Sequence, residues 1–159
     1  MCSMRLTRIE FVCRGNVARS TMAQSLFNHY NQKQNIICNS SGVDDTYLGD
    51  YVHPLTSYVL EREGIEVEPH YARLYREALN YKPDKVFVMD DYTLRRASEV
   101  QNEIGYQPNE LSLLGNYSVN KRDSGLQISI KDPTGDTLEE FISLYQIIGL
   151  SVRNLLLIL

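Results

Sequence analysis

Cys13 and Arg19 are the residues of this sequence whose types and spacing best fit chemistry on an anion. They stand in the run F-V-C-R-G-N-V-A-R-S, with five residues between them. A cysteine thiolate is a strong nucleophile, and positive charge together with backbone N–H groups stabilises it. An arginine guanidinium is a planar fork that can hold two oxygens of a phosphate group. The pair therefore predicts attack by Cys13 on a phosphate group that Arg19 holds.

The residues that surround this pair are typical of a phosphate-binding loop. Gly15 allows the backbone to approach a ligand closely, and Asn16 tolerates left-handed backbone angles. Ser20 can donate a hydrogen bond to the thiolate. A loop that leads into a helix N-terminus directs several N–H groups at one anion. The predicted phosphate-binding residues are Arg14, Gly15, Asn16, Val17, Ala18, Arg19 and Ser20.

Hydrolysis of a phosphate ester also needs a proton donor for the leaving oxygen. Asp132, in the run I-K-D-P-T-G, is the candidate. Pro133 fixes the turn that follows and biases Asp132 towards an extended backbone. An Asp-Pro pair is also a common start to a turn before a helix. The residues alone therefore do not decide whether Asp132 is a general acid or only begins a turn.

The elements that must position these residues follow from the hydrophobic pattern. Short apolar runs over residues 9–13, 36–40, 85–89 and 111–114 predict strands, and helical patterns separate them. We therefore predict an α/β fold, a doubly wound three-layer sandwich with a central four-stranded parallel sheet, as a single domain over residues 1–159. In such folds ligands bind beyond the carboxyl ends of the strands, and Cys13 ends the first one.

Helices are predicted over residues 18–30, around Val59, around Leu94 and from Thr137 onwards. Thr137 and Glu140 have the spacing of a capping box, which marks the start of the last helix. Its predicted buried stripe is Leu138, Phe141, Ile142, Tyr145, Ile148 and Val152.

The charge, the apolar runs and the cysteines of the sequence predict which partners the protein binds and in which compartment it occurs. A net charge of −4 and a pI near 5.4 do not predict binding to nucleic acid or to a membrane surface. The C-terminal run L-L-L-I-L is far shorter than a membrane span, and the sequence shows no signal peptide. Three irregularly spaced cysteines (Cys2, Cys13 and Cys38) fit a reducing compartment rather than a disulfide framework or a zinc site. We expect a cytoplasmic protein that is a monomer or a weak homodimer, without a metal or cofactor.

With these residues in view, the chain resembles the low-molecular-weight protein tyrosine phosphatases. C-R-G-N-V-A-R-S matches their C-x-G-N-x-x-R-S signature, and K-D-P resembles their late Asp-Pro. The resemblance implies that Asp132 is the general acid. It also implies that Ser40, in N-S-S-G, and His70, in E-P-H-Y-A-R, support the loop. The implied activity is metal-independent hydrolysis of phosphotyrosyl proteins through a phosphocysteine, with inhibition by phosphate-like oxyanions.

The chain departs from this family in several places. Ala18 stands where many members have a second loop cysteine, and Arg14 adds charge at the loop. Thr134 and Gly135 replace the tyrosines that usually form a wall against an aromatic substrate, so Tyr47 or Tyr51 is the candidate substitute. An arsenate reductase-like enzyme of the same fold and a non-catalytic phosphate-binding module remain alternatives. The first would need resolving cysteines, and no cysteine follows Cys38.

Overall fold

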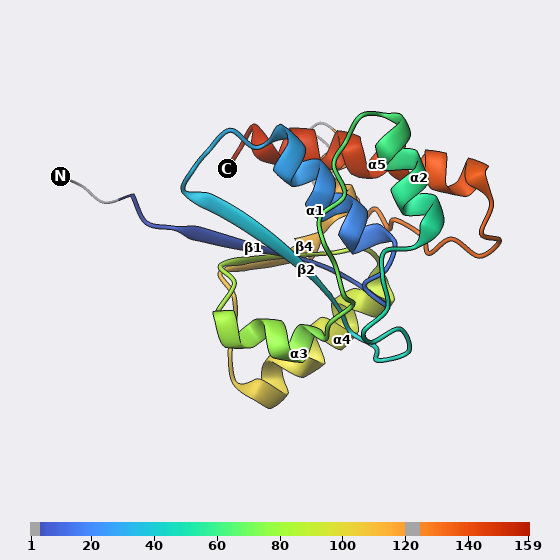
Figure 1. Ribbon diagram of the computed structural model, residues 1–159. Helices are drawn as coiled ribbons and strands as arrows, with labels where there is room; N and C mark the ends of the chain where they lie inside the picture. Colours follow the sequence, from blue (N-terminus) through green and yellow to red (C-terminus); the bar gives the residue numbers. More distant parts are fainter. Residues whose placement is uncertain (1–3, 120–124) are drawn as a thin grey trace.

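The structure is a computed structural model that describes residues 4–119 and 125–159. Its centre is a four-stranded parallel sheet in the order β2-β1-β3-β4 (Figure 1). The elements along the chain are β1 Thr7–Cys13, α1 Arg19–Tyr30, β2 Ile36–Gly42, α2 Pro54–Arg62, α3 Tyr75–Ala78, a 3₁₀ helix Leu79–Tyr81, β3 Lys85–Val88, α4 Asp91–Ile104, β4 Glu110–Leu113, a 3₁₀ helix Leu114–Ser118 and α5 Leu138–Leu156.

Helices cover both faces of the sheet. α1, α2 and α5 lie on one face, and α3 and α4 lie on the other (Figure 1). A hydrophobic core lies on each face of the sheet, and the side chains of β1 point alternately into the two cores, because successive side chains of a strand point to opposite faces. Phe11 packs with α1 and α5, whereas Val12 packs with Val86 and Val88 in the core beneath α3 and α4. The predicted α/β three-layer sandwich is confirmed.

Local capping signals begin the two longest helices. Thr137 accepts a hydrogen bond from the Glu140 N–H and the Glu140 side chain reaches back, which completes the predicted capping box of α5. Asp90 and Thr93 form a second box at the start of α4, which the sequence analysis did not single out. Such caps satisfy backbone N–H groups that have no partner within the helix.

The stripe predicted for α5 is partly correct. Phe141, Ile148 and Val152 are buried, whereas Leu138, Ile142 and Tyr145 are half-buried at the edge of the same core. Leu144, Ser151 and Leu155 also belong to the buried face and were not predicted. The stripe is rotated because α5 packs against both α1 and the 3₁₀ helix Leu114–Ser118. Within the two described ranges, the structure contains no helix long and apolar enough to span a bilayer.

The ends of the strands differ from the prediction where the site begins. β2 extends to Gly42, two residues beyond the predicted end, because it stays in parallel register with β1 until Cys13 opposes Gly42. β3 ends at Val88, one residue earlier than predicted, and β4 spans Glu110–Leu113 rather than residues 111–114. α3 and the two 3₁₀ helices were not predicted.

Candidate active site

Cys13 ends β1 and is nearly inaccessible, with 3% of its surface exposed. Two groups surround its Sγ atom. The Ser20 Oγ lies 3.0 Å away, and the Asn16 backbone N–H donates to the sulfur at 3.2 Å. Both groups can donate hydrogen bonds to a thiolate sulfur at this position.

Asn16 holds the loop of residues 13–20 (the phosphate loop) in its shape. Its φ of 59° is left-handed, as predicted for this position. Its side-chain amide donates to Ser20 at 2.9 Å and to Ser40 at 3.0 Å. Its side-chain oxygen accepts from the Arg73 backbone N–H at 3.0 Å. A buried amide with all of these partners fixes the turn over Cys13.

His70 contacts the same loop from outside. Its Nε2 donates to the Asn16 carbonyl at 2.6 Å. Burial lowers the pKa of His70, and the nearby charge of Arg73 lowers it further, although the hydrogen bond to Asn16 acts in the opposite sense. A neutral imidazole therefore supports the phosphate loop at neutral pH. The structure thus places both Ser40 and His70 against Asn16.

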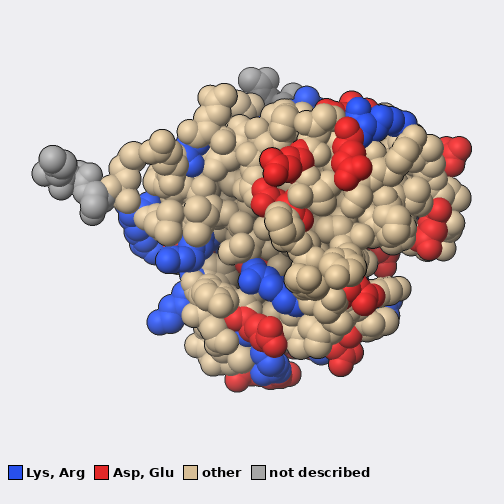
Figure 2. Space-filling model, viewed as in Figure 1, with Lys and Arg blue, Asp and Glu red and all other residues tan. Residues whose placement is uncertain are grey.

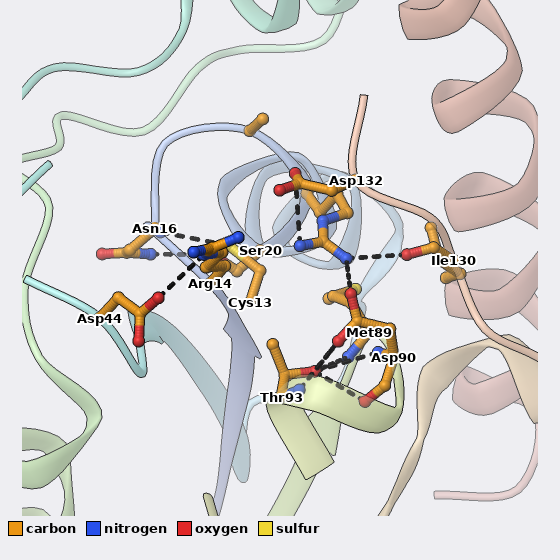
Figure 3. A network of polar contacts seen from close by, with 12 residues as sticks. Cys13, Arg14, Asn16, Ser20, Asp44, Met89, Asp90, Thr93, Ile130 and Asp132 are labelled. Carbon is orange, nitrogen blue, oxygen red and sulfur yellow. Dashed lines mark hydrogen bonds and ion pairs between the residues drawn. The ribbon is translucent and has the colours of Figure 1, made fainter. Parts of the chain in front are cut away.

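Arg19 is the buried cation of the site, with a side chain only 1% exposed. One terminal nitrogen donates to Asp90 at 2.6 Å and to the Ile130 carbonyl at 2.8 Å, and the other lies 3.3 Å from Asp132 (Figure 3). Its Nε is buried and has no hydrogen-bond partner among the described residues. A buried donor without an acceptor is costly, and a phosphate oxygen would satisfy it.

Asp90 comes from the junction of β3 and α4 and orients Arg19. Burial acts to raise the pKa of Asp90, but hydrogen bonds from Arg19 and Thr93 outweigh it and lower the pKa overall. The carboxylate is thus ionised and keeps one edge of the guanidinium occupied. In the sequence, Asp90 is visible only as an acidic residue at the end of a strand. Such a residue is also typical of a helix cap, so its position alone does not indicate a contact with Arg19.

Asp132 lies on the opposite side of Arg19 and has a half-exposed side chain. It precedes Pro133, outside any strand or helix. The structure therefore brings Cys13, Arg19 and Asp132 to one edge of the sheet (Figure 3). A carboxyl group that is accessible and close to the guanidinium can exchange protons with a bound ligand.

The helix that follows the phosphate loop is open at its N-terminus. α1 begins at Arg19, and its N-cap residue Ala18 makes no side-chain capping bond. The positive end of the helix dipole therefore faces the loop without a competing side chain. This arrangement adds to the charge of Arg19 at the place where an anion would bind.

Arg14 does not present a free charge. Its Nε donates to Asp44 at 2.9 Å, and its guanidinium lies 5.2 Å from the centre of the Tyr92 ring. On the face shown in Figure 2, acidic and basic side chains both occur and neither covers the surface. Arg19 offers an anion a buried donor without a partner among the described residues, and the face in Figure 2 shows no continuous basic patch.

The two tyrosine candidates lie in different environments. Tyr47 packs over the phosphate loop, since a Cβ added to Gly15 would lie 2.4 Å from the Tyr47 Cδ2. Tyr51 is 71% exposed, and its ring pairs with that of Tyr71 at 5.1 Å. Of the two candidates, Tyr47 is the one that borders the phosphate loop at Gly15.

Three residues for which the sequence made no prediction contact the site. The Arg73 backbone N–H donates to the Asn16 side chain, and the Arg73 side chain donates to the Ser40 carbonyl and to Glu10. Gly42 lies against the backbone of the phosphate loop. His53 caps α2 with its side chain, and its backbone N–H donates to the Val17 carbonyl. None of these links has a local sequence signal, because each joins distant segments.

Among the residues that the structure describes, the other cysteine and the acidic groups form no second centre. Burial raises the pKa of the Cys38 thiol, with further effects from Glu10 and Glu68, which disfavours the thiolate that would be the nucleophile. Cys2 lies outside the described residues. In the described part of the chain, no three His, Cys, Asp or Glu side chains cluster as metal ligands would.

The fold and the site are those of an α/β protein with a cysteine and a buried arginine at the carboxyl edge of a parallel sheet, an arrangement suited to a phosphate group. The family model for low molecular weight phosphotyrosine protein phosphatase matches residues 8–159. The chain belongs to the low molecular weight phosphotyrosine protein phosphatase family.

Individual relatives match this chain over most of its length. A low molecular weight phosphotyrosine protein phosphatase of Sus scrofa is 29% identical over 140 residues, which are 86% of this chain and 85% of that protein. The crystal structure of YfkJ from Bacillus subtilis superposes with a TM-score of 0.80 at 25% identity, covering 97% of this chain and 94% of that one. A Drosophila arginine phosphatase superposes with a TM-score of 0.81 at 25% identity, covering 94% and 95%.

Proposed function

We propose that this protein is a protein tyrosine phosphatase that works through a phosphocysteine. The observation that carries the proposal is the arrangement around Arg19. Its buried Nε lacks an acceptor, while the Asp132 carboxylate and the phosphate loop with Cys13 lie at the same sheet edge. A phosphate monoester supplies the missing acceptor and places its phosphorus next to the nucleophile.

The reaction has two displacements. The Cys13 Sγ attacks phosphorus, the bond to the ester oxygen breaks, and the protonated Asp132 carboxyl gives its proton to that oxygen. Water then attacks the cysteinyl phosphate and loses a proton to Asp132, and Cys13 leaves as a thiolate with release of inorganic phosphate. Arg19 and the backbone N–H groups of the phosphate loop stabilise the charge on the transferring group in both steps.

Asp90 and Asp132 have different roles in this scheme. Asp90 is half-buried, caps α4 and stays ionised beside Arg19. Asp132 is more accessible and makes the longer contact with Arg19, at 3.3 Å against 2.6 Å for Asp90. A bound phosphate competes with Asp132 for the guanidinium and can release its carboxyl group from that contact. Asp132 is therefore the group that is free to act as an acid.

The phosphotyrosine preference rests on the family and on Tyr47. The Tyr47 ring borders the phosphate loop beside Gly15, where it can pack against the ring of an aryl phosphate. The relative from Drosophila is described as an arginine phosphatase, so phosphoarginine is the comparison substrate for this preference. An arsenate reductase-like activity is not favoured, because Cys38 is a buried thiol with a raised pKa and no cysteine follows it.

The test is hydrolysis of 4-nitrophenyl phosphate by the wild type and by Cys13→Ser, Asp132→Ala and Cys38→Ser. We expect no activity from Cys13→Ser, a loss of about 10²–10⁴-fold in Asp132→Ala, and nearly full activity in the control Cys38→Ser. Phosphate and vanadate should inhibit competitively. A phosphotyrosyl peptide should have a higher kcat/KM than a phosphoarginyl peptide. Full activity in Cys13→Ser would overturn the mechanism, and a preference for phosphoarginine would overturn the substrate assignment.

A further inference from the structure

Residues 132–137, here called the acid segment, carry Asp132 and lead into α5. Asp132 and residues 134–137 are exposed, so few apolar contacts hold this segment. Polar contacts replace them. At its C-terminal end, the Gly135 N–H donates to the Glu140 side chain at 2.9 Å. The position of Asp132 relative to Cys13 therefore depends on a small number of hydrogen bonds.

His53 joins this segment to the phosphate loop. Its backbone N–H donates to the Val17 carbonyl at 2.7 Å, which ties it to the loop. Its Nε2 lies 3.3 Å from the Asp136 Oδ1, which ties it to the acid segment. One residue thus contacts both the loop that carries the nucleophile and the segment that carries the acid.

The His53 ring has a fixed orientation. Its Nδ1 accepts a hydrogen bond from the Leu55 N–H at 3.1 Å, so in the neutral ring the proton is on Nε2 and faces Asp136. The ring also stacks on Phe141, with centres 4.6 Å apart and planes inclined by 25°. Phe141 is fully buried in the core. The imidazole is therefore held by a helix cap on one side and by the core on its face.

Asp136 has a conformation that suits this contact. Its φ of 47° is left-handed, which only glycine and short polar residues such as Asn and Asp adopt readily. This backbone turn occurs where the chain changes direction before the Thr137 cap of α5. A side chain with an acceptor is thus present at a position where the backbone alone would favour glycine.

We propose that His53 and Asp136 form a latch that positions Asp132 for proton transfer to the leaving group. His53 is a positioning residue in this role, because it acts through Asp136 and the acid segment rather than on the substrate. The latch rests on the proposed function of Asp132 as the general acid. The latch predicts a specific kinetic effect, because a displaced acid lowers the rate most when the leaving oxygen is strongly basic.

The variants are chosen so that the fold and the phosphate loop are retained. His53→Asn keeps an oxygen that can cap α2 but is too short to reach Asp136. Asp136→Gly keeps the left-handed backbone and removes the acceptor. Asp136→Asn keeps both the backbone conformation and an acceptor for Nε2–H, and it is the matched control. Each variant is assayed with 4-nitrophenyl phosphate, which has a good leaving group, and with phenyl phosphate, which has a poor one.

We expect His53→Asn and Asp136→Gly to lower kcat/KM for phenyl phosphate by about tenfold and for 4-nitrophenyl phosphate by about twofold. Asp136→Asn should stay within about twofold of the wild type on both substrates. Competitive inhibition by inorganic phosphate should be unchanged in all three variants, because the phosphate loop is intact. In an Asp132→Ala background, the latch variants should cause no further loss.

Equal losses on the two substrates, a loss that persists in Asp132→Ala, or weaker inhibition by phosphate would each overturn the latch. The first two would show that His53 does not act through the acid, and the third that it shapes the phosphate loop instead. If Asp132→Ala itself shows no greater loss on phenyl phosphate, the assignment of the acid fails and the latch fails with it. A leaving-group dependence in Asp132→Ala but not in the latch variants would overturn the latch alone.

Discussion

Gly42, the last residue of β2, lies directly against Asn16 of the phosphate loop. A Cβ on Gly42 would be 3.0 Å from the Asn16 backbone nitrogen and 2.8 Å from the Arg14 carbonyl oxygen. Both atoms belong to the backbone and cannot rotate away. The Asn16 nitrogen is also the donor to the Cys13 sulfur. The absence of a side chain at Gly42 is therefore what allows the loop to close over the nucleophile.

Gly42→Ala is expected to lower kcat/KM by about 10–100-fold, because a displacement of the loop misplaces both Cys13 and its hydrogen bonds. The measurement is steady-state hydrolysis of 4-nitrophenyl phosphate. Gly149→Ala is the matched control, since Gly149 is in the interior of α5 and an added Cβ there has no neighbour within 4 Å. The control should keep its activity and raise the free energy of unfolding by about 0.5–1 kcal/mol. Similar activities in the two variants would contradict the role of Gly42.

Asp90 is expected to act through the orientation of Arg19. Asp90→Ala removes the acceptor of the 2.6 Å hydrogen bond and the cap of α4 together. It should lower kcat/KM by about 10–100-fold and the free energy of unfolding by about 1 kcal/mol. Asp90→Asn keeps one acceptor oxygen, which can cap α4 at the Thr93 N–H, and it replaces the oxygen that accepts from Arg19 by an amide donor. It should therefore recover the stability while the activity stays low. Paired kinetics and urea denaturation separate the two effects, and a fully active Asp90→Asn would contradict the role of Asp90 in orienting Arg19.

Tyr47 and Tyr51 offer a direct test of the substrate wall. Tyr47→Ala should raise KM for a phosphotyrosyl peptide by about tenfold with little change in kcat, because ring packing contributes to binding rather than to the chemical step. Tyr51→Ala should change neither constant, since Tyr51 is 71% exposed and its ring pairs with that of Tyr71. An increase in KM for Tyr51→Ala equal to that for Tyr47→Ala would assign the substrate wall to the loop that carries both tyrosines instead.

Glu10 is expected to make stability depend on pH. It is 3% exposed, and burial raises its pKa from 4.5 to about 7, against the opposing effects of Arg73 and Ser41. The folded protein therefore binds this proton more tightly than the unfolded chain does. Its contribution to the free energy of unfolding is complete below about pH 4.5 and is lost as the pH rises through about 7, a change of about 3 kcal/mol.

Urea denaturation of Glu10→Gln and the wild type at several pH values between about 5 and 8 measures this contribution. The variant should gain stability relative to the wild type as the pH rises, because glutamine does not ionise. Glu61→Gln, which changes an exposed residue of α2, should follow the wild-type curve. Parallel curves for Glu10→Gln and the wild type would show that Arg73 compensates the buried charge fully.

Much of the local structure around the site was predictable from neighbouring residues. The spacing of Cys13 and Arg19 indicated the phosphate loop, and the left-handed backbone of Asn16 follows from its residue type. The capping box of Thr137 and Glu140 marked the start of α5. Apolar runs indicated the four parallel strands. These features depend on interactions over a few residues, and a single sequence records such interactions directly.

The arrangement of the site depended on the tertiary structure. Arg19 meets Asp90 and Ile130, which are 71 and 111 residues away in the sequence, and Gly42 reaches the phosphate loop only because β2 stays in register with β1. His53 and Asp136 likewise meet across the molecule. Periodicity and residue type do not encode which distant segments become neighbours, because that is decided by the strand order and the packing of helices on the sheet. The sequence by itself determined the class of fold and predicted the candidate reactive residues, whereas the packed sheet decided which groups lie against those residues.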